Sequence, residues 1–163
     1  MRRAREIVGL PVLDIRSGNQ VGWVQDMVFD AQEDQVLGLI LEGGHFFQSD
    51  KGIPRNSIVS IGKDALTVDG TELQSLKGVK WSEKLGNQVY TQGGEAKGTI
   101  EDVFLDDSTE RITGFEISDG LFADLFVGRS SVSEQQVVVD GTDVLIVADE
   151  AAPWSTEDKG GLE

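Results

Sequence analysis

The strongest constraint in this sequence is an internal duplication. Residues Val21–Asp30 match residues Lys97–Asp106 without a gap, so that Gly22 corresponds to Gly98, 76 positions further along. Self-similarity at a fixed spacing indicates two copies of one structural unit. The positions that recur are glycines and aspartates set among apolar residues, and we expect the fold to require them: Gly22, Asp26, Asp30 and Gly38 in the first copy, and Gly98, Asp102, Asp106 and Gly114 in the second.

The duplication also predicts how the chain is divided. The first unit spans residues 1–75 and the second spans residues 84–149, with a short linker at 76–83. Trp81 in this linker is interpreted as a packing anchor. Residues 150–163 form an acidic and glycine-rich tail, and a segment of this composition is expected to be disordered.

Apolar residues in both copies tend to recur with a period of two, which is typical of β-strands. In the second copy, Val137–Val139 and Val144–Val147 are separated by Asp140-Gly141-Thr142-Asp143, and Asp-Gly between β-branched runs is a strong hairpin signal. The chain contains 20 glycines, as expected for many tight turns. We therefore predict an all-β fold of two tandem small β-barrels, each with roughly five to six short strands and little helix.

Charge is distributed unevenly along the chain. The net charge is −15; residues 1–80 carry nine Lys and Arg against eleven Asp and Glu, while residues 81–163 carry five against eighteen. The two parts therefore have net charges of −2 and −13. Such an acidic field opposes direct contact with nucleic acid and suits a basic protein partner or a divalent cation, although solubility alone also accounts for it.

The chain has no cysteine, which excludes disulfides, thiolate metal sites and a cysteine nucleophile. The basic start at Met1–Arg5 is followed by an apolar run that is too short for a signal peptide or a membrane span. We therefore expect a cytoplasmic protein without a membrane span.

A longer motif in the first copy points to a known family. It consists of Gly22 with Asp26 and Asp30, then Val36-Leu37-Gly38, then an Ile-Pro segment and a Gly-x-Asp turn within Ile53–Asp64. This pattern resembles the PRC-barrel family, named for the H subunit of the photosynthetic reaction centre.

The second copy matches this motif less fully. We align Arg129–Val132 with Arg55–Ile58, which leaves Val127-Gly128 in place of the proline and no Gly-x-Asp turn. The resemblance extends from Ile7 to about Ala148, and it is strongest with bacterial tandem proteins that are uncharacterised or associated with sporulation.

The resemblance implies a compact barrel that docks onto partners. In reaction centres the family steadies a membrane complex from its cytoplasmic side, and in a ribosome maturation factor it supports binding to the head of the small subunit. The family supplies no catalytic residues, so it implies neither an enzyme activity nor a cofactor.

Few side chains suggest chemistry. His45 is the single histidine, which offers neither a triad nor a two-histidine metal site. Asp26 and Asp30 could act as a general acid and base, but an aspartate repeated beside tight turns more often accepts backbone N–H groups. The acidic cluster of the second copy lacks the spacing of a calcium loop. We therefore expect no metal site, and name only weak candidates: Asp102, Asp106, Asp107 and Glu110.

Large apolar residues that follow two glycine turns form a candidate interaction patch. The segment Gly44–Phe47 corresponds to Gly120–Ala123 at the same spacing of 76. Such residues either form an exposed contact surface or pack at the barrel ends and between the units. The patch comprises His45, Phe46, Phe47, Leu121, Phe122, Leu125 and Phe126.

Three functions are consistent with these features. The leading hypothesis is a non-enzymatic interaction or scaffold module that docks onto an unidentified protein partner or self-associates as a homo-oligomer. A second hypothesis, an accessory role in ribosome maturation or RNA processing, rests on family analogy. The third is an acidic protein that binds divalent cations.

Overall fold

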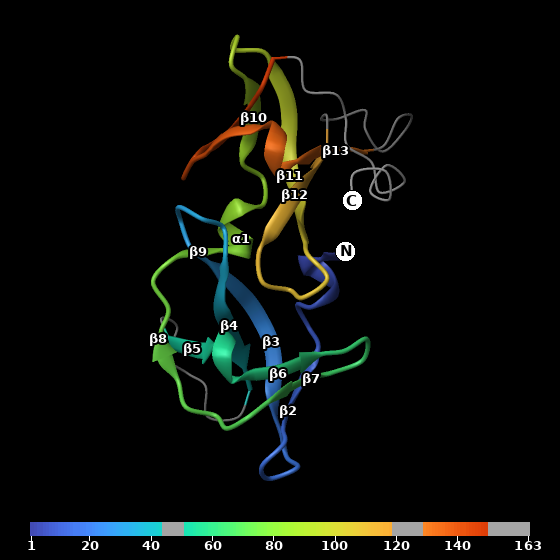
Figure 1. The fold of residues 1–163 in the computed structure, drawn as a ribbon, viewed down its shortest axis with the longest axis vertical. Coiled ribbons are helices and arrows are strands. Elements are labelled where there is room, and N and C mark those ends of the chain that lie inside the picture. The colour runs from blue at the N-terminus through green and yellow to red at the C-terminus, as the bar shows by residue number, and fades with distance from the viewer. Residues whose placement is uncertain (44–50, 119–128, 150–163) are drawn as a thin grey trace.

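Two β-sheets, one from each half of the chain, form the structure (Figure 1). The computed structural model describes residues 1–43, 51–118 and 129–149. These described residues are mostly strands, and their helical segments are only three or four residues long. The first unit lies at one end of the long axis and the second unit at the other. The predicted all-β fold of two tandem units is confirmed.

The first unit is built around the ten-residue strand β3 (Gln20–Phe29). Its neighbours are β2 (Pro11–Asp14) on one side and β4 (Val36–Glu42) on the other, both antiparallel to it. The sheet order is β6-β7-β2-β3-β4-β5-β8. The remaining strands are β5 (Lys51–Pro54), β6 (Ile58–Ile61), β7 (Leu66–Val68) and β8 (Gln74–Ser75).

The second unit repeats this plan around β11 (Ala96–Leu105), which also has ten residues. It lies between β10 (Gln88–Thr91) and β12 (Ile112–Ser118), again with antiparallel pairing. The sheet order is β13-β12-β11-β10-β15-β14. The remaining strands are β13 (Arg129–Ser133), β14 (Val137–Asp140) and β15 (Val144–Val147).

In both units the two flanks of the sheet are joined by a short 3₁₀ turn. In the first unit this turn, η2 (Arg55–Ser57), connects β5 directly to β6, and in the second η3 (Glu134–Gln136) connects β13 to β14. The sheet curls tightly before this turn: a Cβ placed on Gly38 would lie only 2.1 Å from the carbonyl oxygen of Ile53. The recurring glycine of β4 is therefore required by the close approach of β5.

Strand pairing before these 3₁₀ turns shows that our sequence alignment of the two copies is wrong downstream of Gly38. Strand register pairs Gly38 with Pro54 and Gly114 with Ser133, so Ser133 takes the place of the proline. Arg55 consequently corresponds to Glu134, not to Arg129 as we had aligned it. The second copy also keeps its Gly-x-Asp turn, as Gly141-Thr142-Asp143, because the segment between Gly114 and Ser133 is longer than the segment between Gly38 and Pro54.

The two units exchange their first residues. The first arm, β1 (Arg2–Arg3) with η1 (Ala4–Glu6), begins the first unit but pairs with Phe104 and Leu105 of β11. The second arm, β9 (Val79–Lys80) with α1 (Trp81–Lys84), begins the second unit but pairs with the end of β3. The segment expected to be a linker is thus an integral part of the first unit's sheet.

The exchange explains where the core lies. The last four residues of β3 and of β11 are all buried, whereas most residues in the earlier part of each strand are exposed or half-buried. A strand is buried on both faces only where something covers each face. The buried apolar residues accordingly form one cluster that includes both units, Ala4 of the first arm and Ile7, which directly follows this arm. Among the described residues, no helix is long and apolar enough to cross a membrane.

Because each sheet is completed by the other unit's arm, we expect the full chain to unfold in one cooperative transition. Loss of either unit would uncover the edge of the partner's long strand and part of its core. Scanning calorimetry should give equal calorimetric and van't Hoff enthalpies. Two separate transitions, or different midpoints by fluorescence and by far-ultraviolet circular dichroism, would contradict this expectation.

Candidate functional site

The recurring aspartates of the long strands hold the two arms in place. Asp26 of β3 accepts hydrogen bonds from the backbone N–H and the hydroxyl of Ser82 in the second arm, with the N–H at 3.2 Å. It also accepts the N–H of Met27 at 2.9 Å. The first N–H groups of a helical turn have no partner inside the turn, and a carboxylate satisfies them well. Here that carboxylate comes from the opposite unit.

Asp102 of β11 makes the corresponding contacts with the first arm. Its carboxylate accepts the backbone N–H of Arg5 at 3.4 Å and pairs with the Arg5 guanidinium at 3.0 Å. The indole N–H of Trp81 donates to the same carboxylate at 2.9 Å, so the two arms meet at Asp102. Burial raises the pKa of Asp102, and the bonds from Trp81 and Val103 and the charge of Arg5 oppose that rise.

The other recurring positions also have local roles. Asp30 accepts the N–H of Glu33 at 2.8 Å, and Asp106 accepts the N–H of Glu110 at 2.7 Å, so each carboxylate closes the hairpin turn that follows its strand. Gly22 and Gly98 both have positive φ angles, of 156° and 129°.

The two hairpin turns also form hydrogen bonds with each other across the contact between the two units, which we call the joint. The N–H of Val36 donates to the carbonyl of Glu110 at 2.8 Å, and the N–H of Ile112 donates to the carbonyl of Asp34 at 3.0 Å. These residues occupy matching positions in the two copies, so the pair of bonds is reciprocal. A bridge between Gln35 and Arg111 lies between them.

A buried charged cluster lies beneath these turns. Lys84 is only 3% exposed, and its ammonium contacts the carboxylates of Asp140 at 2.8 Å and Asp34 at 3.5 Å. Burial and the neighbouring Asp140 raise the pKa of Asp34 to about 7, against the opposing charge of Lys84. In the first arm the matching residue is Ile7, which is fully buried, so the cluster belongs to one copy only.

The weak metal candidates do not form a common site. Asp102 is held at the arm, and Asp106 closes its turn. Asp107 pairs with the N-terminal amino group, and Glu110 lies 3.3 Å from the guanidinium of Arg55. Within the described ranges, no three side chains of the ligating kinds come together as a metal site.

The apolar candidate patch lies outside the described residues. His45, Phe46 and Phe47 belong to 44–50, and Leu121, Phe122, Leu125 and Phe126 belong to 119–128. The proposed tail, 150–163, lies outside them as well. The patch therefore stays a prediction.

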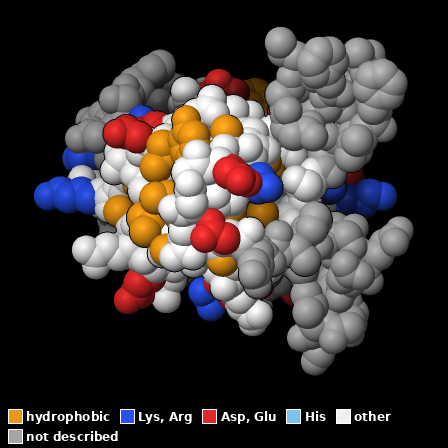
Figure 2. Space-filling view, turned by 90° about the horizontal axis from the view of Figure 1, so that it is seen from above, with side chains coloured by type: hydrophobic (Ala, Val, Ile, Leu, Met, Phe, Trp, Pro, Cys, Tyr) orange, Lys and Arg blue, Asp and Glu red, His pale blue; other side chains and the backbone are white. Residues whose placement is uncertain are grey.

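Sequence reasoning missed other exposed apolar residues. Val59 of β6 is 54% exposed, and Val138 and Val139 of β14 are 47% and 48% exposed. Figure 2 looks onto the end of the second unit, where hydrophobic side chains gather and acidic side chains lie around them. Val59 and Val138 occupy the same position, the second residue of the strand after the 3₁₀ turn. A correct alignment of the two copies would have revealed this recurrence.

Comparison with known proteins agrees with the duplication. The family model described as PRC-barrel domain matches residues 1–75 and again residues 77–152. A protein of Bacillus subtilis (strain 168), described as uncharacterized protein YrrD, is 27% identical over 145 residues, which cover 86% of this chain and 83% of that protein.

Replacement of Asp102 by alanine should lower the free energy of unfolding by about 3 kcal/mol, because it leaves a tryptophan N–H and an arginine without their buried acceptor. Urea denaturation at pH 7 measures the change. Asp107→Ala is the control, since that carboxylate is 77% exposed and should cost little. Equal effects of the two substitutions would contradict the role of Asp102.

The buried cluster predicts a pH dependence of stability. Since the pKa of Asp34 is raised to about 7, the folded state holds more protons than the unfolded state between about pH 4 and pH 7. The free energy of unfolding attributable to Asp34 should therefore fall as pH rises through this window and level off above it. In Asp34→Asn this slope should vanish, and the variant should exceed the wild type at pH 8 by up to about 4 kcal/mol, the equivalent of a rise of roughly three pKa units. If the free energy of unfolding changes with pH in the same way for the two proteins between pH 5 and pH 8, the assignment is overturned.

Proposed function

This chain belongs to the PRC-barrel family, and on that premise we propose that it is a non-enzymatic docking protein whose two joined barrels bind a partner protein. The observation that carries the proposal is the recurrence of an exposed valine at the same place in both units. Val59 and Val138 are more than two-fifths exposed, whereas Ile58, the residue before Val59, is buried and Val137, the residue before Val138, is partly buried against the core. An apolar residue that neither copy buries is available for contact with another molecule.

The backbone around these valines supports binding through side chains. β6 and β14 are the outermost strands of their sheets, and each has a bulge at its exposed valine. A bulge disturbs the hydrogen-bonding edge and so discourages the addition of another strand. The bulge also presents the valine outward, which suits packing of a partner's apolar side chain against the sheet.

The joint gives such a module its rigidity. The arm contacts at Asp26 and Asp102 tie each unit to the other, so the two valines keep a fixed separation. When a partner contacts both units, the docking protein therefore loses little conformational entropy, and this favours binding.

Charge favours a different protein over a second copy of this chain. Two copies that each carry a net charge of −15 repel one another. A partner with a basic surface is attracted by the same field, and its association is fastest at low ionic strength. The proposed partner is therefore a protein that combines apolar contact residues with basic surroundings.

The double substitution Val59→Ser/Val138→Ser tests the proposal. The partner is first isolated by affinity capture on the wild-type chain and purified, and its affinity is then measured by calorimetry. Two half-exposed valines contribute about 1 kcal/mol each when they become buried, so the variant should bind at least about tenfold more weakly. The matched control is Ser60→Ala, a neighbouring exposed position.

Light scattering of the wild-type chain supplies the second measurement. A stable dimer of the wild type that dissociates in the double variant would show that a second copy occupies this surface and would contradict the proposal. Unchanged affinity of the purified partner for the double variant would contradict it as well.

A further inference from the structure

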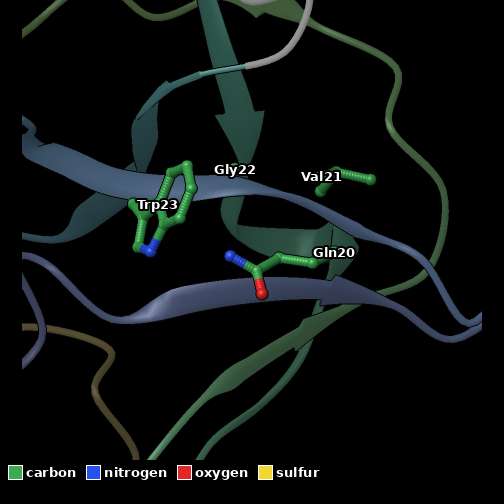
Figure 3. Close-up of a pocket in the computed structure, with 4 residues that line it drawn as sticks. All are labelled: Gln20, Val21, Gly22 and Trp23. Carbon is green, nitrogen blue, oxygen red and sulfur yellow. The ribbon is translucent and has the colours of Figure 1, made fainter.

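A pocket on the outer face of the first unit carries an inference beyond docking through the valines. It is an open, shallow pocket of about 470 Å³, lined by Gln20, Val21, Gly22 and Trp23 of β3 (Figure 3). The carboxamide of Gln20 is directed toward the indole of Trp23, while Val21 points away from both. Trp23 is 45% exposed, which is unusual for so large an apolar side chain in the middle of a sheet.

Strand register places a carboxylate beside this indole. Trp23 pairs directly with Glu42 of β4, so the two side chains project from the same face of the sheet at neighbouring positions. The indole ring packs against the backbone of Gly43, because a Cβ on this glycine would lie 3.0 Å from Cζ3 of Trp23. The indole is thus held against the backbone next to an exposed acidic side chain.

The second copy shows that the fold does not require this arrangement. At the matching positions of β11 and β12, Thr99 pairs with Ser118. The same pair of strands therefore forms with small polar residues in place of tryptophan and glutamate. By contrast, the aspartates that hold the arms recur in both copies. An exposed aromatic residue that only one copy has is better explained by binding than by folding.

The chemistry of the pair favours a cation. The face of an indole attracts positive charge, and the carboxylate of Glu42 adds a direct partner for it. Within the described part of the chain, no Lys or Arg pairs with Glu42, and the one cation recorded over an aromatic ring is Arg3 over Phe104. A guanidinium stacks on an aromatic face and bonds a carboxylate with two N–H groups, whereas an ammonium is a compact, strongly hydrated charge.

We infer that this pocket, together with Glu42 on the neighbouring strand, binds an arginine side chain presented by the partner protein. This inference rests on the proposed docking function and names the chemistry of a second contact, separate from the two valines. The guanidinium lies on the indole and bonds to Glu42, and the carboxamide oxygen of Gln20 accepts a further N–H. The net charge of −15 draws such a basic segment toward the chain.

Nuclear magnetic resonance of the ¹⁵N-labelled full chain tests the inference. The probe is a short glycine peptide with two arginines, compared with the same peptide carrying citrulline, which has the shape of arginine without its charge. We expect the arginine peptide to shift the Trp23 indole and Glu42 amide signals in a saturable way. The citrulline peptide should bind at least tenfold more weakly, and the same peptide with lysine in place of arginine should have an intermediate affinity.

The second copy supplies matched variants. Trp23→Thr and Glu42→Ser introduce the residues that β11 and β12 carry, and each should weaken binding of the arginine peptide at least fivefold. The indole signal of Trp81, which is fixed at Asp102, reports whether each variant remains folded. Equal binding of the arginine and citrulline peptides by the wild type would overturn the inference regardless of how the variants fold.

Two further outcomes separate this inference from its premise. A maltooligosaccharide or a mononucleotide that shifts Trp23 when the arginine peptide does not would show that the pocket takes a sugar or a base, and would overturn the inference alone. Val59→Ser/Val138→Ser should leave the arginine peptide affinity unchanged. If that variant still loses the protein partner while the arginine peptide fails to bind, the docking function stands and the pocket assignment falls.

Discussion

The structure depends on a carboxylate from each unit that satisfies the backbone of the other unit's arm. Asp26 receives the arm that begins with β9, and Asp102 receives the arm that begins with β1. The relation is mutual, since a turn without its acceptor and a buried carboxylate without its donors are both costly. Neither unit is complete without the other, because each contributes an arm to its partner's sheet.

The uneven charge follows in part from this joint. Three arginines of the first unit contact acids of the second unit: Arg3 lies 2.9 Å from Glu116, Arg5 lies 3.0 Å from Asp102, and Arg55 lies 3.3 Å from Glu110. In these three pairs the first unit supplies the cation and the second supplies the anion, whereas the contact of Lys84 with Asp34 runs the other way. The remaining acidic residues give the chain its negative charge, and we propose that this charge attracts a basic partner.

Comparison of the two copies separates what the fold needs from what it leaves free. The aspartates and glycines that recur are explained by arms, turns and close backbone approaches. Ile7 and Lys84 differ, and the difference places a titratable cluster in the second copy alone. Trp23 and Thr99 differ, and only the first copy has an indole beside a carboxylate. The exposed valines recur without being buried, which sets them apart from the core.

The sequence by itself determined the duplication, the all-β class and the hairpins, because strand period and turn chemistry are properties of neighbouring residues. It also contained one sign of the joint: the end of β3 is continuously apolar from Met27 to Phe29, with no polar face. Only the tertiary structure decided that the supposed linker is a strand of the first unit and that Val59 and Val138 are both exposed. The arm strands are two residues long and pair with residues about 50 to 100 positions away. Such short segments have no period of their own, so the partner that covers them, and not their composition, determines their structure.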